Sequence, residues 1–600
     1  MKKTFENLKK AYFFDILFLT GSFLAFGLFK EYAGCIYTGI WGILNVIKIG
    51  QNSSRENNLQ ENRKQALPVS CFNKNIVLCI SVIALFYLLT CLYGIDRGMS
   101  LIGFLKFMSI PLFLIYLIQM SEEERRTLRA LIPLLGCFMT FLGILGRFIP
   151  SFYQFFYVAD RLGGFFQYPN VFALFCLVGL LLLLENEQIE QKKLGGIFTE
   201  ALILFAGILL SGSRTVFFLS VLSAFLVFGH FPKLREKMFL LFVFSGLMIA
   251  AIVGISGNLQ NAGRFLTTSL NSSTLIGRII YWWDGLGELI KHPFGLGYLG
   301  YYYREPVIQR AVYSVRFIHN DFLQLALDVG IIPAVGFAVV FIEQLWKKEL
   351  SFVRKIALLV MLLHFFMDFD LEFTAIWYLL LLIVAEPRQT EKIVKATQIN
   401  ALSQIKIRTR GVVVPGVVFS CVCFYIGAAM LPYYLGNPGL SSGLLPFYTE
   451  ANVEVLSSET DIDKAEKRAE KILKQNEYVP EAYDVKAILA LGKEDYTGMV
   501  AAKEMSLSLQ KYNMESFERY LVLLAKGINA AAEKGDSEGT QVLLQAAVNV
   551  PKLLNETEKQ TIGLAYKIKD VPDFTLSDWA REFLDEADKS IHIIVGAFFM

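Results

Sequence analysis

Charge is scarce in this chain of 600 residues. Only 18% of its residues are charged, whereas soluble domains average about 25%. Hydrophobic residues make up 54% of the chain and the mean hydropathy is +0.47. Apolar runs close to the ~20 residues that cross a hydrocarbon core recur through residues 1–436. This composition excludes an ordinary soluble globular protein and predicts an all-α, polytopic helical membrane protein.

The usual cofactor motifs are also missing. The chain has no Walker phosphate loop, no H-E-x-x-H pair and no C-x-x-C pair, so we expect no cofactor and no metal. The eight cysteines lie in or beside apolar segments, and none falls within 257–320 or 437–600. Neither of those regions is therefore expected to be a disulfide-stapled module.

Thirteen apolar segments are candidates for membrane crossings. They fall at 11–29, 32–49, 76–95, 101–120, 128–149, 168–184, 197–212, 215–231, 237–256, 322–345, 353–367, 371–386 and 412–435. The first of them contains Asp15 and is followed directly by a second apolar segment, which favours a retained helix over a cleaved signal peptide. We therefore expect about 12–13 transmembrane helices in a membrane domain spanning residues 1–436.

Basic residues fall in alternate connections. They cluster at 2–10, 55–74, 125–129, 192–193, 233–237, 347–355 and 392–410. By the positive-inside rule these regions and the N-terminus are cytoplasmic. The other connections then face outward: 96–100, 150–167, the turn near Ser213, the large external loop 257–320 and the turn at 368–371. An odd number of crossings also places residues 437–600 outside.

The C-terminal region differs in charge and in pattern. Residues 1–436 hold 39 lysines and arginines against 27 acidic residues, whereas residues 437–600 hold 18 against 27. A linker rich in glycine, proline and serine occupies 437–453. Short amphipathic helices follow, and their pattern predicts a soluble helical-repeat domain at 454–600 that is similar to tetratricopeptide repeats. Such repeats usually bind partners.

Polar residues that could bind an anionic substrate gather on the predicted external side. Arg161, Arg214 and Arg278 are either anchors at the membrane boundary or ligands for phosphate, because guanidinium stays charged and presents a planar set of donors. His319 is either a structural histidine at a helix start or a general base. Asn320, next to it, is suited to cap the helix that follows.

Two further groups accompany this set. The acidic stretch H-F-F-M-D-F-D-L-E-F (364–373) contains Asp368, which could position an arginine or coordinate a cation; arginine positioning is favoured. Four tyrosines (298, 301, 302 and 303) could form an interfacial belt or a sugar-stacking surface.

Several short motifs together resemble the O-antigen ligase family over roughly residues 76–390. They are R-L-G-G-F-F-Q-Y-P-N-V-F-A (161–173), L-S-G-S-R-T (210–215), R-I-I-Y-W-W (278–283), H-P-F-G-L-G (292–297), H-N-D-F-L-Q-L-A-L-D-V-G (319–330) and H-x-x-x-D-F-D (364–370). The resemblance implies a metal-independent, inverting transfer of a glycan from an undecaprenyl pyrophosphate donor to an acceptor hydroxyl. It implies that Arg214 and Arg278, with Arg161 as a weaker candidate, hold the pyrophosphate and that His319 is the catalytic base. Asn320, Tyr281 and Asp368 are supporting residues.

The resemblance also implies a place and partners. It predicts a multi-pass protein of the bacterial cytoplasmic membrane that takes a lipid-linked glycan donor and has no nucleic-acid partner. The extra crossing and the tail depart from the family pattern, and we expect the tail to recruit a glycan, cell-wall or protein acceptor. A polymerase of the same family, a flippase for lipid-linked glycans and a non-catalytic scaffold are the alternatives.

Overall fold

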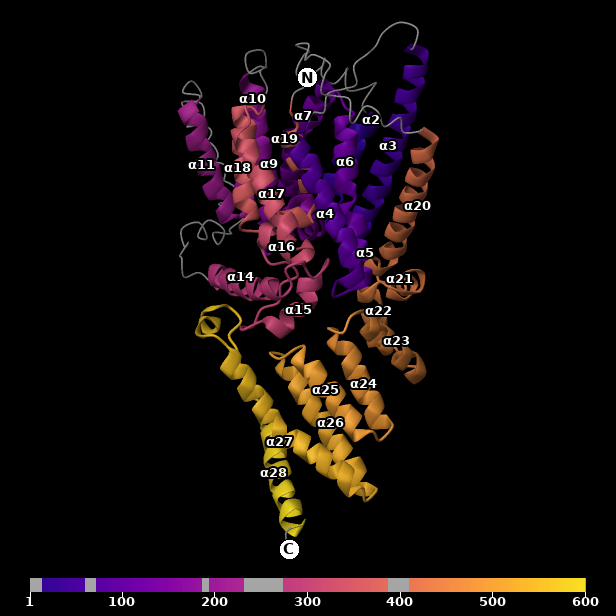
Figure 1. Ribbon diagram of the computed structural model, residues 1–600. Coiled ribbons are helices and arrows are strands. Elements are labelled where there is room, and N and C mark those ends of the chain that lie inside the picture. Colours follow the sequence, from indigo (N-terminus) through magenta and orange to yellow (C-terminus); the bar gives the residue numbers. More distant parts are fainter. Residues whose placement is uncertain (1–12, 60–71, 186–193, 231–272, 387–408, 599–600) are drawn as a thin grey trace.

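A computed structural model describes residues 13–59, 72–185, 194–230, 273–386 and 409–598. Within these ranges the chain is helical apart from loops and one short hairpin, in which β1 (Tyr157–Val158) pairs antiparallel with β2 (Arg161–Leu162). Figure 1 shows an upright helical bundle with the N-terminal region at one end and a second, smaller helical body, the tail, at the other. We call this second side of the bundle its tail end.

Five described helices are long and apolar enough to cross a membrane. They are α3 (Glu31–Leu59), α4 (Lys74–Tyr93), the continuous pair α5 (Arg97–Phe107) and α6 (Ser109–Ile118), α7 (Glu122–Gly146) and α20 (Thr409–Tyr434). Shorter apolar helices are α2 (Phe13–Leu24), α9 (Pro169–Glu185), α10 (Leu194–Ser211), α11 (Arg214–His230), α17 (Ile331–Glu343) and α19 (Thr374–Val384), and α18 (Phe352–Phe365) stands beside them. The prediction of an all-α polytopic membrane protein is confirmed. The predicted segment 237–256 lies outside the described residues, so the count of crossings stays a prediction.

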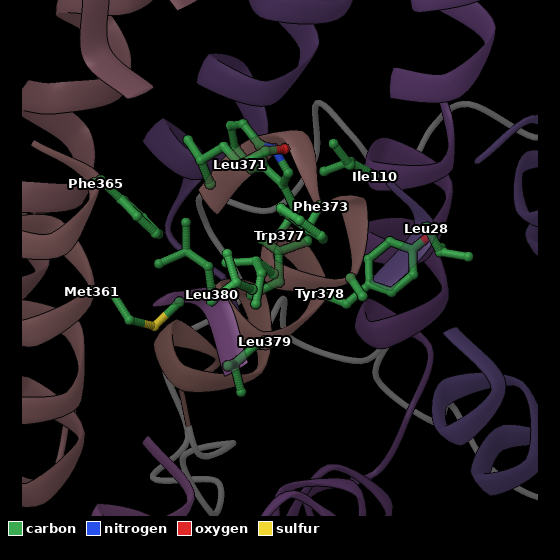
Figure 2. Close-up of a cluster of buried hydrophobic side chains, with 14 of the residues drawn as sticks. Leu28, Ile110, Met361, Phe365, Leu371, Phe373, Trp377, Tyr378, Leu379 and Leu380 are labelled. Carbon is green, nitrogen blue, oxygen red and sulfur yellow. The ribbon is translucent and has the colours of Figure 1, made fainter. Parts of the chain in front are cut away.

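The centre of the bundle is α19. Every residue of this helix from Thr374 to Val384 is buried, as expected for a helix that is apolar on all sides. Figure 2 shows Trp377, Tyr378 and Leu380 within a cluster of side chains contributed by neighbouring helices. In contrast, only a third of the spanning stretch of α4 is buried, which leaves an apolar face for lipid. Because α19 is packed on all sides, the short loop before it is fixed at the tail end of the bundle.

The predicted apolar segment 322–345 is not one helix. It breaks at Gly330 into α16 (Asp321–Val329) and α17. Gly330 has φ +96° and its Cα lies so close to Pro293 and Phe294 that a Cβ would meet their backbone at 2.8 Å. Only glycine combines this conformation with so close an approach, which explains why a continuous apolar pattern contains a sharp turn.

The described part of the predicted loop 257–320 is mostly helical. It contains α14 (Ser273–Lys291) and α15 (Gly300–Ile308), and Figure 1 shows α14 lying across the tail end of the bundle below the upright helices. Tyr298 and Tyr301 are 2% or less exposed, so these two tyrosines form neither an interfacial belt nor a sugar-stacking surface.

The tail consists of α21 (Pro438–Leu444), α22 (Thr449–Ser458), α23 (Ile462–Gln475), α24 (Pro480–Gly492), α25 (Tyr496–Ser508), α26 (Met514–Glu533), α27 (Ser537–Gln560), a 3-10 turn η7 (Gly563–Lys567) and α28 (Asp578–Phe598). Residues 437–453, expected as a linker, hold α21 and the start of α22. Asn437 caps α21 and Pro438 takes its first turn, where a proline lacks no needed hydrogen bond. A stretch rich in helix-breaking residues is therefore itself helical.

Several polar contacts attach the tail to the bundle. The carboxylate of Asp96, at the start of α5, accepts hydrogen bonds from Thr449, from Gln475 (3.0 Å) and from Asn476 (3.2 Å). On the other side, η7 packs against α14, and the Ile562 amide donates to the Arg310 carbonyl at 3.1 Å. The segment between α14 and α16 is therefore held by the bundle on one side and by the tail on the other.

Candidate active site

Asp368 and His319 form a hydrogen-bonded pair at the tail end of the bundle. Asp368 lies in the loop between α18 and α19 and is 1% exposed, and its Oδ1 is 3.0 Å from Nδ1 of His319. Burial alone would raise the pKa of this carboxyl. The hydrogen bond and charge of His319, together with the nearby Arg278 guanidinium, outweigh burial and hold the pKa of Asp368 below its ordinary value. An ionised Asp368 fixes the imidazole tautomer that has its proton on Nδ1, so Nε2 is left as the acceptor nitrogen.

The backbone around His319 is constrained. His319 has φ +51°, a left-handed conformation that non-glycine residues adopt rarely, and it immediately precedes the α16 cap. Asn320 accepts the Leu323 amide at 3.1 Å, which confirms its predicted capping role, and Gln324 accepts the Ile318 amide at 2.9 Å. These two hydrogen bonds hold the strained residue between them.

The imidazole of His319 lies among aromatic rings. It packs edge-on against Phe369 at 4.8 Å and lies 6.0 Å from the ring of Tyr281. Burial raises the pKa of Tyr281 to about 12, so its hydroxyl keeps its proton. One fifth of the His319 side chain remains exposed, and within the described part of the chain Nε2 has no hydrogen-bond partner. Asp368 thus orients the imidazole ring through Nδ1, and part of the ring remains accessible.

Arg278 approaches the other oxygen of the same carboxylate. This arginine lies on α14, is 9% exposed, and places a terminal guanidinium nitrogen 3.6 Å from Oδ2 of Asp368. Its Nε is buried and forms no hydrogen bond to any described residue. A buried guanidinium donor without an acceptor is unusual, and it makes Arg278 suited to receive an anion.

Arg161 reaches Asp368 through an intermediate side chain. Its Nε donates to the Ser211 carbonyl at 2.8 Å, and a terminal nitrogen donates to Oδ1 of Asn170 at 2.6 Å. The amide of Asn170 in turn donates to Oδ2 of Asp368 at 2.6 Å. Arg161 is therefore a brace between the hairpin, the end of α10 and the site.

Arg214 stands at the turn beside this brace. It is the first residue of α11, two residues after Gly212, whose missing Cβ would lie 3.5 Å from Nε of Arg161. Arg214 is partly buried, and no described residue forms a hydrogen bond or ion pair with its side chain. Its charge is therefore not neutralised by any described residue.

Two contributors were absent from the sequence-based set. The Tyr168 hydroxyl donates to Asp368 at 2.8 Å, and Asn170 supplies the bridge described above. Both flank Pro169 in the motif at 161–173, from which only Arg161 was singled out. A polar residue on each side of a proline that begins a helix is the signal that could have identified them, because proline extends the residue before it and fixes the first turn after it.

The acidic stretch 364–373 does not act as one group. Among the described residues, Asp368 alone in this stretch pairs with an arginine, whereas Asp370 pairs with His364 at 2.6 Å and Glu372 with Lys106 at 3.5 Å. Within the described ranges no three histidine, cysteine or acidic side chains are grouped as a metal site. The expectation that these carboxylates position an arginine is therefore correct for Asp368 alone.

The glycines after α14 have a structural role. Gly295 and Gly297 have φ of +89° and +84°, and a Cβ at Gly295 would meet the Asp328 carbonyl at 2.5 Å. With Gly300 they also satisfy a G-x-G-x-x-G spacing. They join two helices, without the preceding strand that a dinucleotide-binding turn requires. They let the α14–α15 connection pack against α16.

Residues 201–338 match the O-antigen ligase family. The matched range contains Arg214, Arg278, Tyr281 and His319, whereas Asp368 lies beyond its end. The match supports a membrane glycan function of the O-antigen ligase or polymerase type, with a glycosyltransferase-like activity. The comparisons with curated proteins and with solved structures give no match. The assignment of roles within the O-antigen ligase-like region therefore depends on the geometry of its side chains.

Proposed function

We propose that this protein transfers a glycan from an undecaprenyl pyrophosphate donor to an acceptor hydroxyl at the outer face of the bacterial cytoplasmic membrane. The observation that carries the proposal is the shared carboxylate of Asp368, which orients His319 through one oxygen and faces Arg278 with the other. A base and an anion-binding cation are thereby held on opposite sides of one fixed group. That is the arrangement required for nucleophilic displacement of an anionic leaving group.

The reaction follows from these positions. The acceptor hydroxyl transfers its proton to Nε2 of His319 as its oxygen attacks the anomeric carbon, and a new glycosidic C–O bond forms with inversion. The bond between that carbon and the pyrophosphate oxygen breaks, and its electron pair leaves with the lipid pyrophosphate. Arg278 and Arg214 stabilise the growing negative charge, and Arg161 holds Asp368 in place through Asn170. Asp368 stabilises the imidazolium that forms, and no metal or cofactor takes part.

The same chemistry serves a polymerase when the acceptor is itself a lipid-linked glycan. A flippase for lipid-linked glycans needs no base oriented toward a hydroxyl, so the His319–Asp368 pair favours transfer over transport. We propose in addition that the helical-repeat tail recruits the acceptor, as tetratricopeptide-like arrays recruit partners. Loosening the tail should then raise the KM for the acceptor and leave the KM for the donor unchanged; the opposite pattern contradicts this role.

The test is reconstitution of the full-length protein in vesicles with a defined undecaprenyl-pyrophosphate glycan. We expect His319→Ala to lower the rate of glycan transfer by about 10²–10⁴-fold and Arg278→Ala by about 10²–10³-fold. His292→Ala and Arg97→Ala are matched controls, because both residues are exposed or half-exposed and lie outside the Asp368 network. Normal transfer by His319→Ala would refute the mechanism. Product length separates ligase from polymerase, and glycan translocation without a new covalent bond would indicate a flippase.

A further inference from the structure

One face of α14 carries exposed apolar side chains at helical spacing. Ile279, Trp283, Leu286 and Ile290 are between 46% and 79% exposed. Steps of four, three and four residues place them along a single stripe of the helix. The remaining side of α14 is packed against the protein and holds Arg278, Tyr281, Asp284 and Glu288, all buried. An exposed apolar stripe of this kind on an otherwise packed helix indicates a binding surface.

The stripe lies beside a surface that faces lipid. Phe294, 61% exposed, follows the end of α14, and the neighbouring Pro293 carbonyl accepts the Ile331 amide at 3.0 Å. Ile331 begins α17, whose exposed residues Ile332, Val335 and Val339 form the apolar face of an upright helix. Figure 1 shows α14 lying across the tail end of these upright helices. The stripe and the lipid face of α17 are therefore neighbours that meet at Phe294, with the exposed Lys291 and the half-exposed His292 between Ile290 and Phe294.

We propose that the α14 stripe lies in the interfacial layer of the lipid bilayer and makes α14 an interfacial helix. Phospholipid suits the surface because Phe294 connects the stripe to the membrane-facing side of α17, and Lys291 and His292 between Ile290 and Phe294 are polar groups of the kind that meet lipid headgroups. Tryptophan within such a stripe is typical of the membrane–water boundary. A protein partner or a second copy of this chain would leave part of this apolar surface in water.

The interfacial position of α14 affects binding of the lipid-linked donor, an inference that rests on the proposed function. Arg278 precedes Ile279 directly, so it lies about 100° around the helix from the stripe. With the stripe among lipid chains, the guanidinium of Arg278 lies at the level of lipid headgroups. A polyprenyl donor then keeps its chain in the bilayer while its pyrophosphate reaches Arg278. The bilayer thus contributes to donor affinity through α14.

Lipid contact is tested directly by fluorescence quenching. The full-length protein is reconstituted in vesicles of phosphatidylcholine with or without bromine on the acyl chains. The emission lost in Trp283→Phe reports Trp283, and that lost in Trp579→Phe reports a partly exposed tryptophan of the tail as the matched control. We expect brominated lipid to quench the Trp283 component by about half or more and the Trp579 component hardly at all. Equal quenching of the two components would overturn the proposal.

The consequence for the donor is tested with Ile290→Glu, which places a charge in the stripe. Ile488→Glu on α24 is the matched control, since Ile488 is also well exposed (59%) but belongs to the tail. We expect Ile290→Glu to raise the KM for the lipid-linked donor by about five- to tenfold with little change in kcat, and Ile488→Glu to change neither. An unchanged donor KM in Ile290→Glu would overturn the link to the donor. If wild-type protein transfers no glycan, the proposed function fails while the quenching result still decides the position of α14.

Discussion

Two arginines at the tail end of the bundle bind carboxylates in different ways. Arg316 lies between Glu31 of α3 and Glu450 of α22, at 2.9 Å and 2.7 Å, so two carboxylates match one guanidinium. Arg278 has one carboxylate, at 3.6 Å, and shares it with His319 and two neutral donors. In the first network two carboxylates share one guanidinium, and in the second one carboxylate is shared by a guanidinium and three other side chains.

The difference separates a structural ion pair from the proposed binding site. Arg316 connects the bundle to the tail, and the Tyr434 hydroxyl also donates to Glu31, so this network is closed by its own members. Around Asp368 the carboxylate is saturated, whereas Nε of Arg278 is left without an acceptor among the described residues. Arginine–carboxylate pairs alone therefore do not mark the site. An unmatched donor alone does not mark it either, since buried nitrogens of Arg129 and Arg468 also lack a hydrogen-bond acceptor among the described residues. The combination marks it: an unmatched donor beside the His319–Asp368 pair, where an arriving anion would complete the network.

Disrupting the network around Asp368 should have the largest effect on the rate of glycan transfer. We expect Asp368→Asn to lower kcat by about 10²–10⁴-fold, because the amide can donate to Nδ1 of His319 and move the imidazole proton to Nε2, where it blocks proton transfer. The protein should remain folded, since the amide has the same size and its oxygen, in the position of Oδ2, still accepts from Asn170. The measurement is the rate of glycan transfer in vesicles, with Asp573→Asn in the exposed part of the tail as control. A kcat within twofold of wild type would show that His319 does not need Asp368.

Disrupting the network around Arg316 should lower the free energy of unfolding more than the rate of glycan transfer. Arg316→Met leaves Glu31 and Glu450 facing each other without a cation, and we expect a loss of about 1–3 kcal/mol in the free energy of unfolding. This lies below the cost for a fully buried pair because 34% of the Arg316 side chain is exposed. Thermal unfolding in detergent, with acceptor and donor KM values, provides the measurement.

The control for Arg316→Met removes the stranded charges as well. The triple variant Arg316→Met, Glu31→Gln, Glu450→Gln should recover most of the lost melting temperature, because neutral groups need no counter-ion. If Arg316→Met melts like wild type, the pair contributes nothing to holding the tail.

Sequence patterns could predict those parts of the fold that a single physical property, such as apolar length, determines. Apolar length identified the long helices, and a helix that is apolar on all sides, such as α19, had to be central. The break at Gly330 was not predictable, because it depends on the backbone of Pro293, which no local pattern reports. The helices within 437–453 were missed since proline and glycine counts do not distinguish a helix start at Asn437 from an irregular link.

The site was predictable to the level of residue type and side. His319, Arg278 and Asp368 were identified from motifs, and the structure brings them together. Their hierarchy was not predictable: Asp368 is central, while Arg161 is a brace that reaches it only through Asn170. Distances of this kind depend on how α9, α14 and the loop before α19 pack, and 190 or more residues separate the members of some pairs.

Glu305 on α15 differs from both networks, because it is a buried carboxylate that pairs with no described cation. Its oxygens accept only from the Val315 amide and the Gln309 side chain, both at 3.3 Å, and no described residue forms an ion pair with it. Burial raises the pKa of Glu305 from 4.5 to about 8, so the folded protein holds a proton that the unfolded chain releases across this range. Stability should therefore fall as the pH rises from about 4.5 to 8. Glu305→Gln, which is neutral at every pH, should melt like wild type at pH 5 and about 2–4 °C higher at pH 8.5. A difference in melting temperature that stays constant over this range would show that Glu305 keeps its charge in the folded protein, as Glu31 does beside Arg316.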